Sequence, residues 1–79
     1  MPAAGTARLC LARNIRELRS LNGVSQEELA LEAGLHRTFV AHVERGVRNI
    51  SIDNIEKLAM ALGVPPYRLL MDSQGGGAR

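Results

Sequence analysis

Apolar residues recur along the chain at helical intervals, and no stretch alternates between apolar and polar residues as a strand would. Leu11, Ile15 and Leu18 follow one another at steps of four and three residues, which predicts a first helix from about residue 7 to 21. The dipeptide NG at positions 22–23 then breaks the chain. Helical segments follow through to residue 71, so we expect an all-α fold, a compact bundle of five helices.

Two short helices come next, with hardly any chain between them. SQEE at positions 25–28 is a capping box, in which Ser25 caps the second helix and Glu28 reaches back from the third position. Gly34 ends this helix, as glycine does where a left-handed residue is needed. A third helix must begin near His36 and end at Gly46, because helical spacing resumes at Phe39, Val40 and Val43.

The remaining helices are marked by a cap and by two prolines. Ser51 starts a fourth helix, and Asp53 in its first turn is favoured by the helix dipole. GVPP at positions 63–66 ends that helix and opens a short fifth one, PPYRLL, with proline in the first turn. The buried side of the fourth helix should carry Ile55, Leu58, Ala59 and Leu62.

The join between the second and third helices is the most informative part of the chain. Two short helices with a few residues between them cross steeply, and this requires small residues where they touch. Ala30 provides the small contact and Gly34 provides the turn. The angle between the helices should be filled by Leu29, Ala33, Leu35, Val40 and Val43.

Length and composition allow one small domain, which we place at residues 8–71 between flexible ends at 1–7 and at the glycine-rich 72–79. A fold of this size is marginal alone, and the single Cys10 permits neither an internal disulfide nor a zinc framework. We therefore expect a second copy of the chain to stabilise it. No apolar run approaches a membrane span and the start does not resemble a signal peptide, so we expect a cytoplasmic protein.

The charge pattern gives a weak hint of an anionic partner. The formal net charge is +2, but nine of the ten basic residues are arginine, which forms forked bonds with phosphate and guanine. A GC-rich genome is an equal explanation of the arginines. Phe39 and Tyr67 are the only aromatic residues, which argues against binding single strands or RNA by base stacking.

Enzyme and metal chemistry have no support in the sequence. We find no serine–histidine–acid set, no phosphate loop and no carboxylate pair that so small a bundle could shelter. His36, His42 and Cys10 lack the spacing of a ligand set. We expect no catalytic residue, no metal, no cofactor and no small-molecule effector.

One face of the third helix suits the major groove of DNA. At about 100° per residue, the outer face gathers Arg37, Thr38, Ala41, His42 and Arg45, opposite Phe39, Val40 and Val43. The major groove admits one α-helix; arginine can bond guanine twice, and threonine can bond a base or touch a thymine methyl group. Ala41 in the middle would let the helix approach closely. The alternative is that these are ordinary solvated residues.

The segment QEELALEAGLHRTFVAHVERG, residues 26–46, resembles the helix-turn-helix of the phage-repressor-like family of bacterial regulators, called the Xre or Cro/CI family. The family's signature spacing is met by Gln26, Ala30, Gly34, Val40 and Val43, and by ERG at 44–46. The resemblance extends over roughly residues 15–70 and implies a lambda-repressor-like DNA-binding domain.

Within that family, HRTFVAHVERGVRNISI is most similar to the RTYISxIERxxRNxTI pattern of the small controller proteins of restriction–modification systems. The chain departs from this pattern at Phe39, where tyrosine is usual, at Gly46, and at His42, where a small residue is usual. The departure at His42 bears on sequence preference.

The resemblance implies base-reading roles for Arg37, Thr38 and His42, with Arg48 as a further base contact in controller-like proteins. It places His36 near a phosphate and pairs Arg19 with Glu44 as a brace for the third helix. Docking in that position would also put phosphates within reach of Gln26, Arg45 and Asn49. The nearby Glu27, Glu28 and Glu32 must then turn away from DNA or be neutralised.

A single recognition helix reads only a few base pairs, so we expect a homodimer that binds a pseudo-palindrome with half-sites about one helical turn apart. The late apolar residues exceed what so small a fold can bury, and we assign them to this interface: Ile50, Ile52, Val64, Tyr67, Leu69, Leu70 and Met71. Such a dimer can repress by covering a promoter, or activate by binding upstream and touching RNA polymerase.

The function expected from these residues is therefore a sequence-specific regulator that binds double-stranded DNA and controls a restriction–modification operon. A phage-type repressor and an antitoxin of the same family are alternatives. A protein-interaction module whose arginine face docks an acidic protein is a further, less favoured one.

Overall fold

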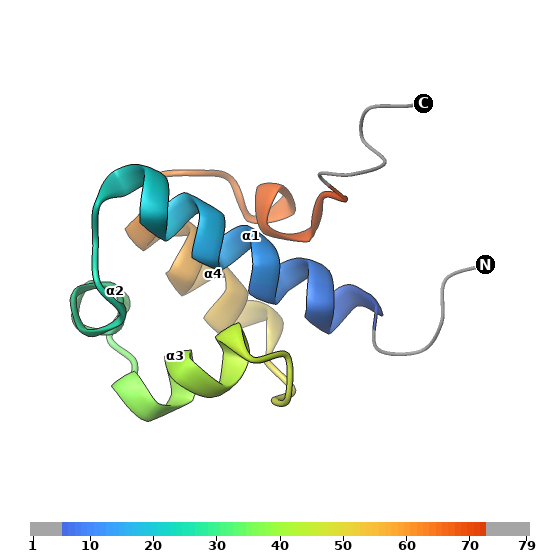
Figure 1. The fold of residues 1–79 in the computed structure, drawn as a ribbon, viewed down its shortest axis with the longest axis horizontal. Coiled ribbons are helices and arrows are strands. Elements are labelled where there is room, and N and C mark those ends of the chain that lie inside the picture. Colours follow the sequence, from blue (N-terminus) through green and yellow to red (C-terminus); the bar gives the residue numbers. More distant parts are fainter. Residues whose placement is uncertain (1–5, 73–79) are drawn as a thin grey trace.

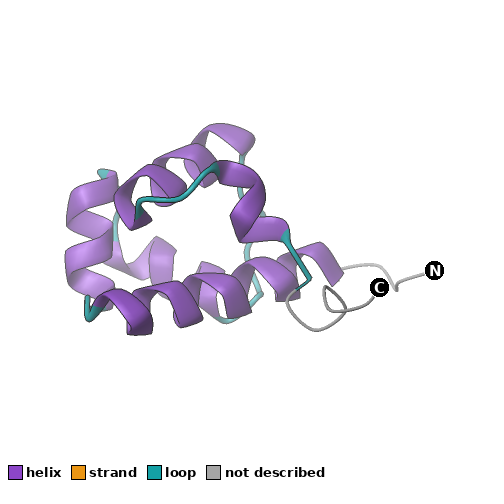
Figure 2. Cartoon of the chain, turned by 90° about the horizontal axis from the view of Figure 1, so that it is seen from above, coloured by secondary structure: helices purple, strands orange, loops and turns teal. Residues whose placement is uncertain are grey.

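The computed structural model describes residues 6–72, which form helices and turns without a strand (Figures 1 and 2). Four α-helices follow one another: α1 (Thr6–Asn22), α2 (Gln26–Ala33), α3 (Arg37–Glu44) and α4 (Ile52–Leu62). A 3-10 helix, η1 (Pro66–Leu70), completes the described chain. The expected all-α class is confirmed, but the fifth α-helix is not: the structure has a 3-10 turn in its place.

The difference at η1 has a local physical cause. Five residues are too few to propagate an α-helix, and Pro66 at its first position donates no backbone hydrogen bond. The amide of Arg68 instead donates to the carbonyl of Pro65 at 3.0 Å, the three-residue step of a 3-10 turn.

The start of the folded region also differs from the expectation. α1 begins at Thr6, within the end that we expected to be flexible, and Asp72 lies 3.5 Å from Arg13 at the other end. The rest of the two expected flexible segments, 1–5 and 73–79, lies outside the described residues.

The caps read from the sequence form the two short turns that place α2 and α3. The Ser25 hydroxyl accepts the amide of Glu28 at 3.1 Å, and the Glu28 carboxylate accepts the amide of Ser25 at 2.8 Å. Gly34 has φ of +73°, and the following amide, that of Leu35, donates to the Ala30 carbonyl at 2.9 Å. This left-handed residue lets α3 begin three positions later, at Arg37.

One apolar core joins all the elements. In Figure 1, α1 crosses the molecule with α3 below it, η1 above it and α4 behind it. The core contains the residues expected to fill the helix crossing, of which Leu29, Ala33, Val40 and Val43 are buried and Leu35 is half-buried. Ala30, the expected small contact between the two helices, is also buried. Leu69 is fully buried, so its assignment to an interface is wrong: the 3-10 turn points this side chain into the core.

A buried carboxylate links α1, α2 and α3. Glu44 is 3% exposed, and Arg19 donates to both of its oxygens, from Nε at 2.8 Å and from Nη2 at 3.0 Å. Gln26 donates its Nε2 to the same carboxylate at 2.9 Å. The expected pairing of Arg19 with Glu44 is therefore present in the structure, with Gln26 as a third member.

The ionisation of Arg19 follows from this arrangement. The hydrogen bonds that it donates to Glu44 raise the pKa of Arg19 above its ordinary value, burial opposes this, and the opposite charge adds to it. The guanidinium consequently remains a charged donor throughout the range in which the protein can be studied.

A second buried polar residue, Asn14, holds the end of the described chain against α1. Its Nδ2 donates to the carbonyls of Leu69 at 2.8 Å and Met71 at 2.7 Å, and its side chain is fully buried. Both carbonyls lie at or beyond the end of η1, where no later amide of a described helix is placed to donate to them. Asn14 therefore fixes the path of the chain beyond η1.

Neighbouring residues of α2 provide a test of the helix crossing. Ala30 is 3% exposed and Leu31 is 82% exposed. We predict that Ala30→Leu lowers the free energy of unfolding by about 1–3 kcal/mol because it overpacks the crossing. Leu31→Ala should change it by less than about 0.5 kcal/mol. Urea unfolding of both variants measures this, and similar losses would contradict the assigned packing.

The brace makes an equally direct prediction. Arg19→Ala leaves a buried carboxylate without its cation and should cost about 3 kcal/mol of unfolding free energy. Arg13→Ala is the matched control, because its partner Asp72 is 62% exposed at 3.5 Å and such surface pairs contribute less than about 1 kcal/mol. A loss for Arg19→Ala no larger than that of the control would show that Glu44 is not held by this pair.

Candidate nucleic-acid interface

The two sides of α3 have the polarity that the sequence predicts. Val40 and Val43 are buried, whereas Arg37, Thr38 and Arg45 are exposed and His42 is half-buried. Phe39 is half-buried and packs against the edge of the core. The helix and its C-cap residue Arg45 thus present to the outside two cations, a hydroxyl and an imidazole.

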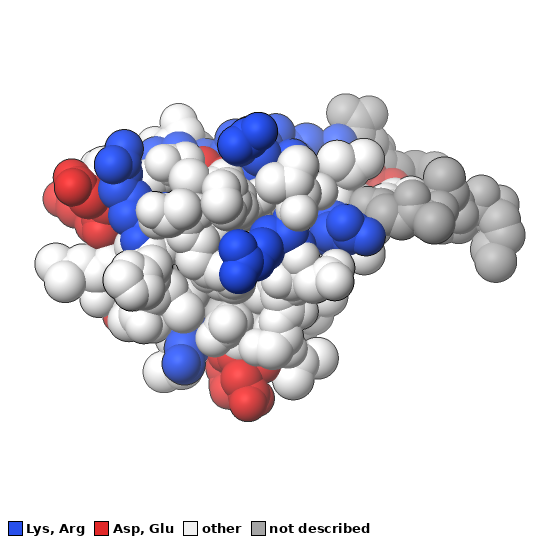
Figure 3. Space-filling model, turned by 90° about the horizontal axis from the view of Figure 1, so that it is seen from below, with Lys and Arg blue, Asp and Glu red and all other residues white. Residues whose placement is uncertain are grey.

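Basic side chains are spread over the face of the molecule on which α3 lies. Figure 3 views this face from below, and it shows Lys and Arg across the middle with most of the visible Asp and Glu at two margins. The carboxylate of Glu28 accepts a hydrogen bond from the amide of Ser25 at 2.8 Å and so forms part of the cap of α2. Glu27 and Glu32 remain exposed on α2.

The start of α2 contributes an amide that is already engaged. Gln26, expected to bind phosphate, donates one hydrogen of its Nε2 to Glu44. A side-chain amide nitrogen has two hydrogens, so one remains for an outside acceptor. The phosphate contact of Gln26 stays a prediction, and the structure adds a structural role that the sequence did not suggest.

His36 stands at the N-cap of α3 with extended backbone angles of −73° and 141°, and its side chain makes no capping hydrogen bond. It is exposed beside Arg37. His36 thus marks the start of α3 through its backbone, and its role toward an outside phosphate stays a prediction.

The loop after α3 carries Arg45, Arg48 and Asn49, all exposed. The guanidinium carbon of Arg48 lies 5.3 Å from the centroid of the Phe39 ring, within the range of a cation–π contact. Arg48 and Phe39 border a hollow together with His36 and Thr38. The structure thus brings one loop residue next to the N-terminal half of α3.

Two residues of this region have structural roles that the sequence analysis did not predict. Arg16 donates from Nη1 to the backbone carbonyl of Glu44, which is one of the acceptors left without a partner at the end of α3. It lies one turn before Arg19 on α1 and therefore on the same side of the helix. Its spacing from the predicted brace residue could have indicated from the sequence that it also reaches Glu44. Gln26, as a donor to Glu44, is the second case and had no sequence signal.

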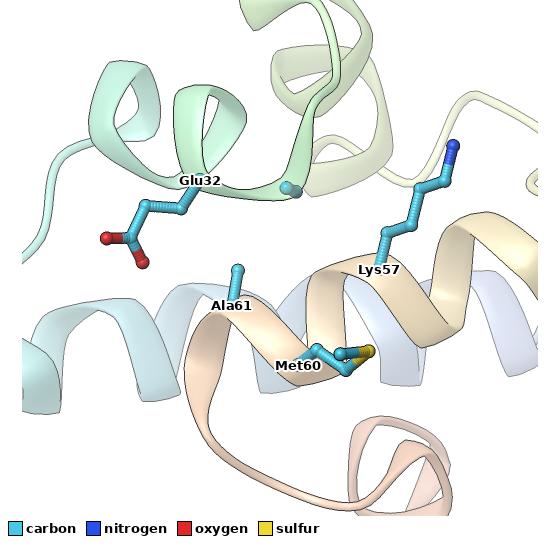
Figure 4. Close-up of a pocket in the computed structure, with 5 residues that line it drawn as sticks. Glu32, Lys57, Met60 and Ala61 are labelled. Carbon is cyan, nitrogen blue, oxygen red and sulfur yellow. The ribbon is translucent and has the colours of Figure 1, made fainter.

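A separate hollow lies between α2 and α4 and is lined by Glu32, Ala33, Lys57, Met60 and Ala61. In Figure 4, Glu32 and Lys57 stand at its two sides and their charged ends point away from each other. Residues 6–72 contain no group of three or more His, Cys, Asp or Glu placed to hold a metal ion. Within the same residues, no helix has the length and apolarity to cross a membrane.

Comparison with known proteins places this arrangement in a family. The family model described as Helix-turn-helix, HTH_3, matches residues 15–69. Control protein C.BamHI of Bacillus amyloliquefaciens is 52% identical over 64 residues, which cover 80% of this chain and 79% of that protein. The residues 15–69 matched by the family model contain all of α2, α3 and the loop that follows α3.

Solved structures agree with the sequence comparison. The hypothetical transcription factor NHTF from Neisseria has a TM-score of 0.87 at 49% identity, covering 96% of this chain and 87% of that one. The restriction-modification controller protein C.AhdI from Aeromonas hydrophila has a TM-score of 0.76 at 48% identity, covering 78% and 94%. The controller protein C.Esp1396I, as a tetramer in complex with its natural 35 base-pair operator, has a TM-score of 0.72 at 26% identity, covering 86% and 87%.

The matched residues include both helices of the crossing, the turn at Gly34 and the brace at Glu44. The chain therefore belongs to the HTH_3 family of helix-turn-helix transcription regulators, which are not enzymes, and its relatives include control proteins of restriction–modification systems.

Proposed function

We propose that this protein is a sequence-specific regulator that binds double-stranded DNA and controls the transcription of a restriction–modification operon. The observation that carries the proposal is the outer face of α3, which exposes Arg37 and Thr38 while α1 and α2 fix the helix from behind. An α-helix held rigidly with forked and hydroxyl donors outward fits the major groove. The similarity to controller proteins, one of them in complex with its operator, supports the same function.

The side chains divide into two groups by the part of DNA that each would meet. Those of α3 and its following loop that reach base edges are Arg37, Thr38, His42 and Arg48. Those at the margins would bind phosphates and fix the orientation, namely Gln26, His36, Arg45 and Asn49. Phosphate contacts contribute affinity that depends on salt, and base contacts contribute the preference for one sequence.

A homodimer is the second part of the proposal. Four residues of the expected interface are exposed: Ile52 at 77%, Tyr67 at 69%, Leu70 at 44% and Met71 at 43%. Ile50 and Val64 are half-buried and pack against the core. A groove lined by Leu11, Ile50, Ile55 and Leu70 continues this apolar surface onto α1. Covering such a surface with its own copy would bury apolar area that a marginal fold leaves exposed.

The proposal places the dimer in the cytoplasm on a pseudo-palindromic operator, with its two α3 helices about one turn of DNA apart. Contact with RNA polymerase stays a prediction that applies if the protein activates. A protein-interaction module remains the rival from another class. It requires that the arginine face bind an acidic protein and show no preference among DNA sequences.

Selection of duplexes from a random-sequence pool at about 0.15 M salt tests the main proposal. We expect a pseudo-palindrome with half-sites about 10 base pairs apart. Arg37→Ala should cost about 1–3 kcal/mol on that sequence and remove the preference at one base of each half-site. A pool that stays random would favour the rival.

Arg45→Ala is the matched control, since it removes the other arginine of this face. We expect it to weaken cognate and scrambled duplexes by the same factor and to reduce the salt slope of the binding constant by about 1. Equal behaviour of the two variants on both duplexes would defeat the division into base and phosphate contacts.

The dimer makes its own prediction. Ile52→Lys should shift the protein from dimer to monomer in analytical ultracentrifugation, with the helical circular dichroism unchanged, because it puts a charge into an apolar contact. Leu21→Lys is the control: Leu21 is 79% exposed but lies at the opposite end of α1 from the groove, about 20 Å from Arg8. A wild-type protein that sediments as a monomer at micromolar concentration would refute the homodimer.

A further inference from the structure

We infer that Phe39 is a positioning residue for base recognition: its ring holds Arg48 beside Thr38, so that a residue of the loop reads a base next to those read by α3. The inference rests on the proposed function and adds to it a residue that touches no DNA. Its starting point is the contact of 5.3 Å between the Arg48 guanidinium carbon and the centroid of the Phe39 ring.

The ring is the contact that fixes Arg48. Within residues 6–72, no hydrogen bond or ion pair engages its guanidinium, and the side chain is exposed on the loop between α3 and α4. An exposed arginine without such bonds samples many rotamers, and the conformational entropy that it loses on binding weakens the complex. Stacking against an aromatic ring restricts them beforehand while leaving the planar edge of the guanidinium free to donate.

The ring also decides where that edge lies. Phe39 is on the first turn of α3 and half-buried against the core, so its own position is fixed by packing. Arg48 follows nine positions later, beyond the end of α3, yet it borders the same hollow as His36 and Thr38 at the helix start. The contact therefore brings the guanidinium back along α3, toward the half of the helix that would enter the groove first.

The alternative is that Phe39 only packs at the edge of the core, and that its contact with Arg48 has no part in recognition. Both interpretations agree that removing the ring lowers stability. They differ in what happens to the preference for individual bases, because a packing residue affects every base of the site alike. The identity of the bases preferred is therefore the decisive readout.

The experiment compares Arg48→Ala, Phe39→Leu and Phe39→Tyr with the wild-type protein in selection from a random duplex pool. Dissociation constants then follow on the selected operator and on operators changed at one base. Arg48→Ala should lower the preference at one base about fivefold or more. Phe39→Leu should lower it at that same base by about two- to fivefold, the effect of losing an exposed cation–π contact. Phe39→Tyr keeps the ring and should keep the preference.

The double variant Phe39→Leu with Arg48→Ala completes the test. It should match Arg48→Ala alone at that base, because the ring acts only through the guanidinium. Urea unfolding establishes that each variant is folded at the assay temperature, and Phe39→Met replaces Phe39→Leu if the latter is not.

Three outcomes would overturn the inference while leaving the regulator intact. They are an even loss at all bases for Phe39→Leu, a loss at a different base from that of Arg48→Ala, and additive losses in the double variant. Failure of Arg48→Ala to change any preference would likewise show that Arg48 reads no base. A wild-type protein that selects no sequence at all would instead refute the proposed function itself.

Discussion

The arrangement of this small fold depends on one buried carboxylate, that of Glu44. A charged group at 3% exposure is stable only with several donors around it, and here they come from two other helices. Arg19 of α1 supplies two hydrogen bonds and Gln26 of α2 supplies one. Because all three helices must meet at one point to satisfy the charge, their relative angles have little freedom. The helix that would read DNA is the one that carries the carboxylate.

This constraint matters because α3 cannot be stable by itself. It has eight residues, and isolated helices of that length do not persist in water. Its inner face is held by burial of Val40 and Val43, and its last carbonyl accepts a hydrogen bond from Arg16. With one side and one end fixed, the opposite side is free to carry side chains that contribute nothing to folding. Binding chemistry and stability are thus separated on the two sides of a single helix.

Periodic features of the fold could be predicted from the sequence, and aperiodic ones could not. The capping box at Ser25, the turn at Gly34 and the buried side of α3 follow from spacing within a few residues. The bonds of Asn14 to carbonyls 55 and 57 positions away, and of Gln26 to Glu44, depend on how whole helices pack. The same applies to Leu69, since an apolar residue in a short terminal turn can face the core or the solvent with equal sequence signals. Interface roles assigned to Tyr67 and its neighbours stay predictions for that reason.

The position of Asn14 explains how the surface proposed to bind DNA and the segment proposed to form the dimer interface are held in fixed positions relative to each other. On α1, Asn14 and Arg19 are five residues apart, which puts them about 140° apart around the helix. Arg19 therefore faces α3 while Asn14 faces η1, and Figure 1 shows that α3 and η1 lie on opposite sides of α1. One rigid helix holds both the surface for DNA and the segment that bears Leu70 and Met71. If the protein dimerises as proposed, these polar contacts of α1 would hold each recognition helix in a fixed position relative to the interface segment of its own copy.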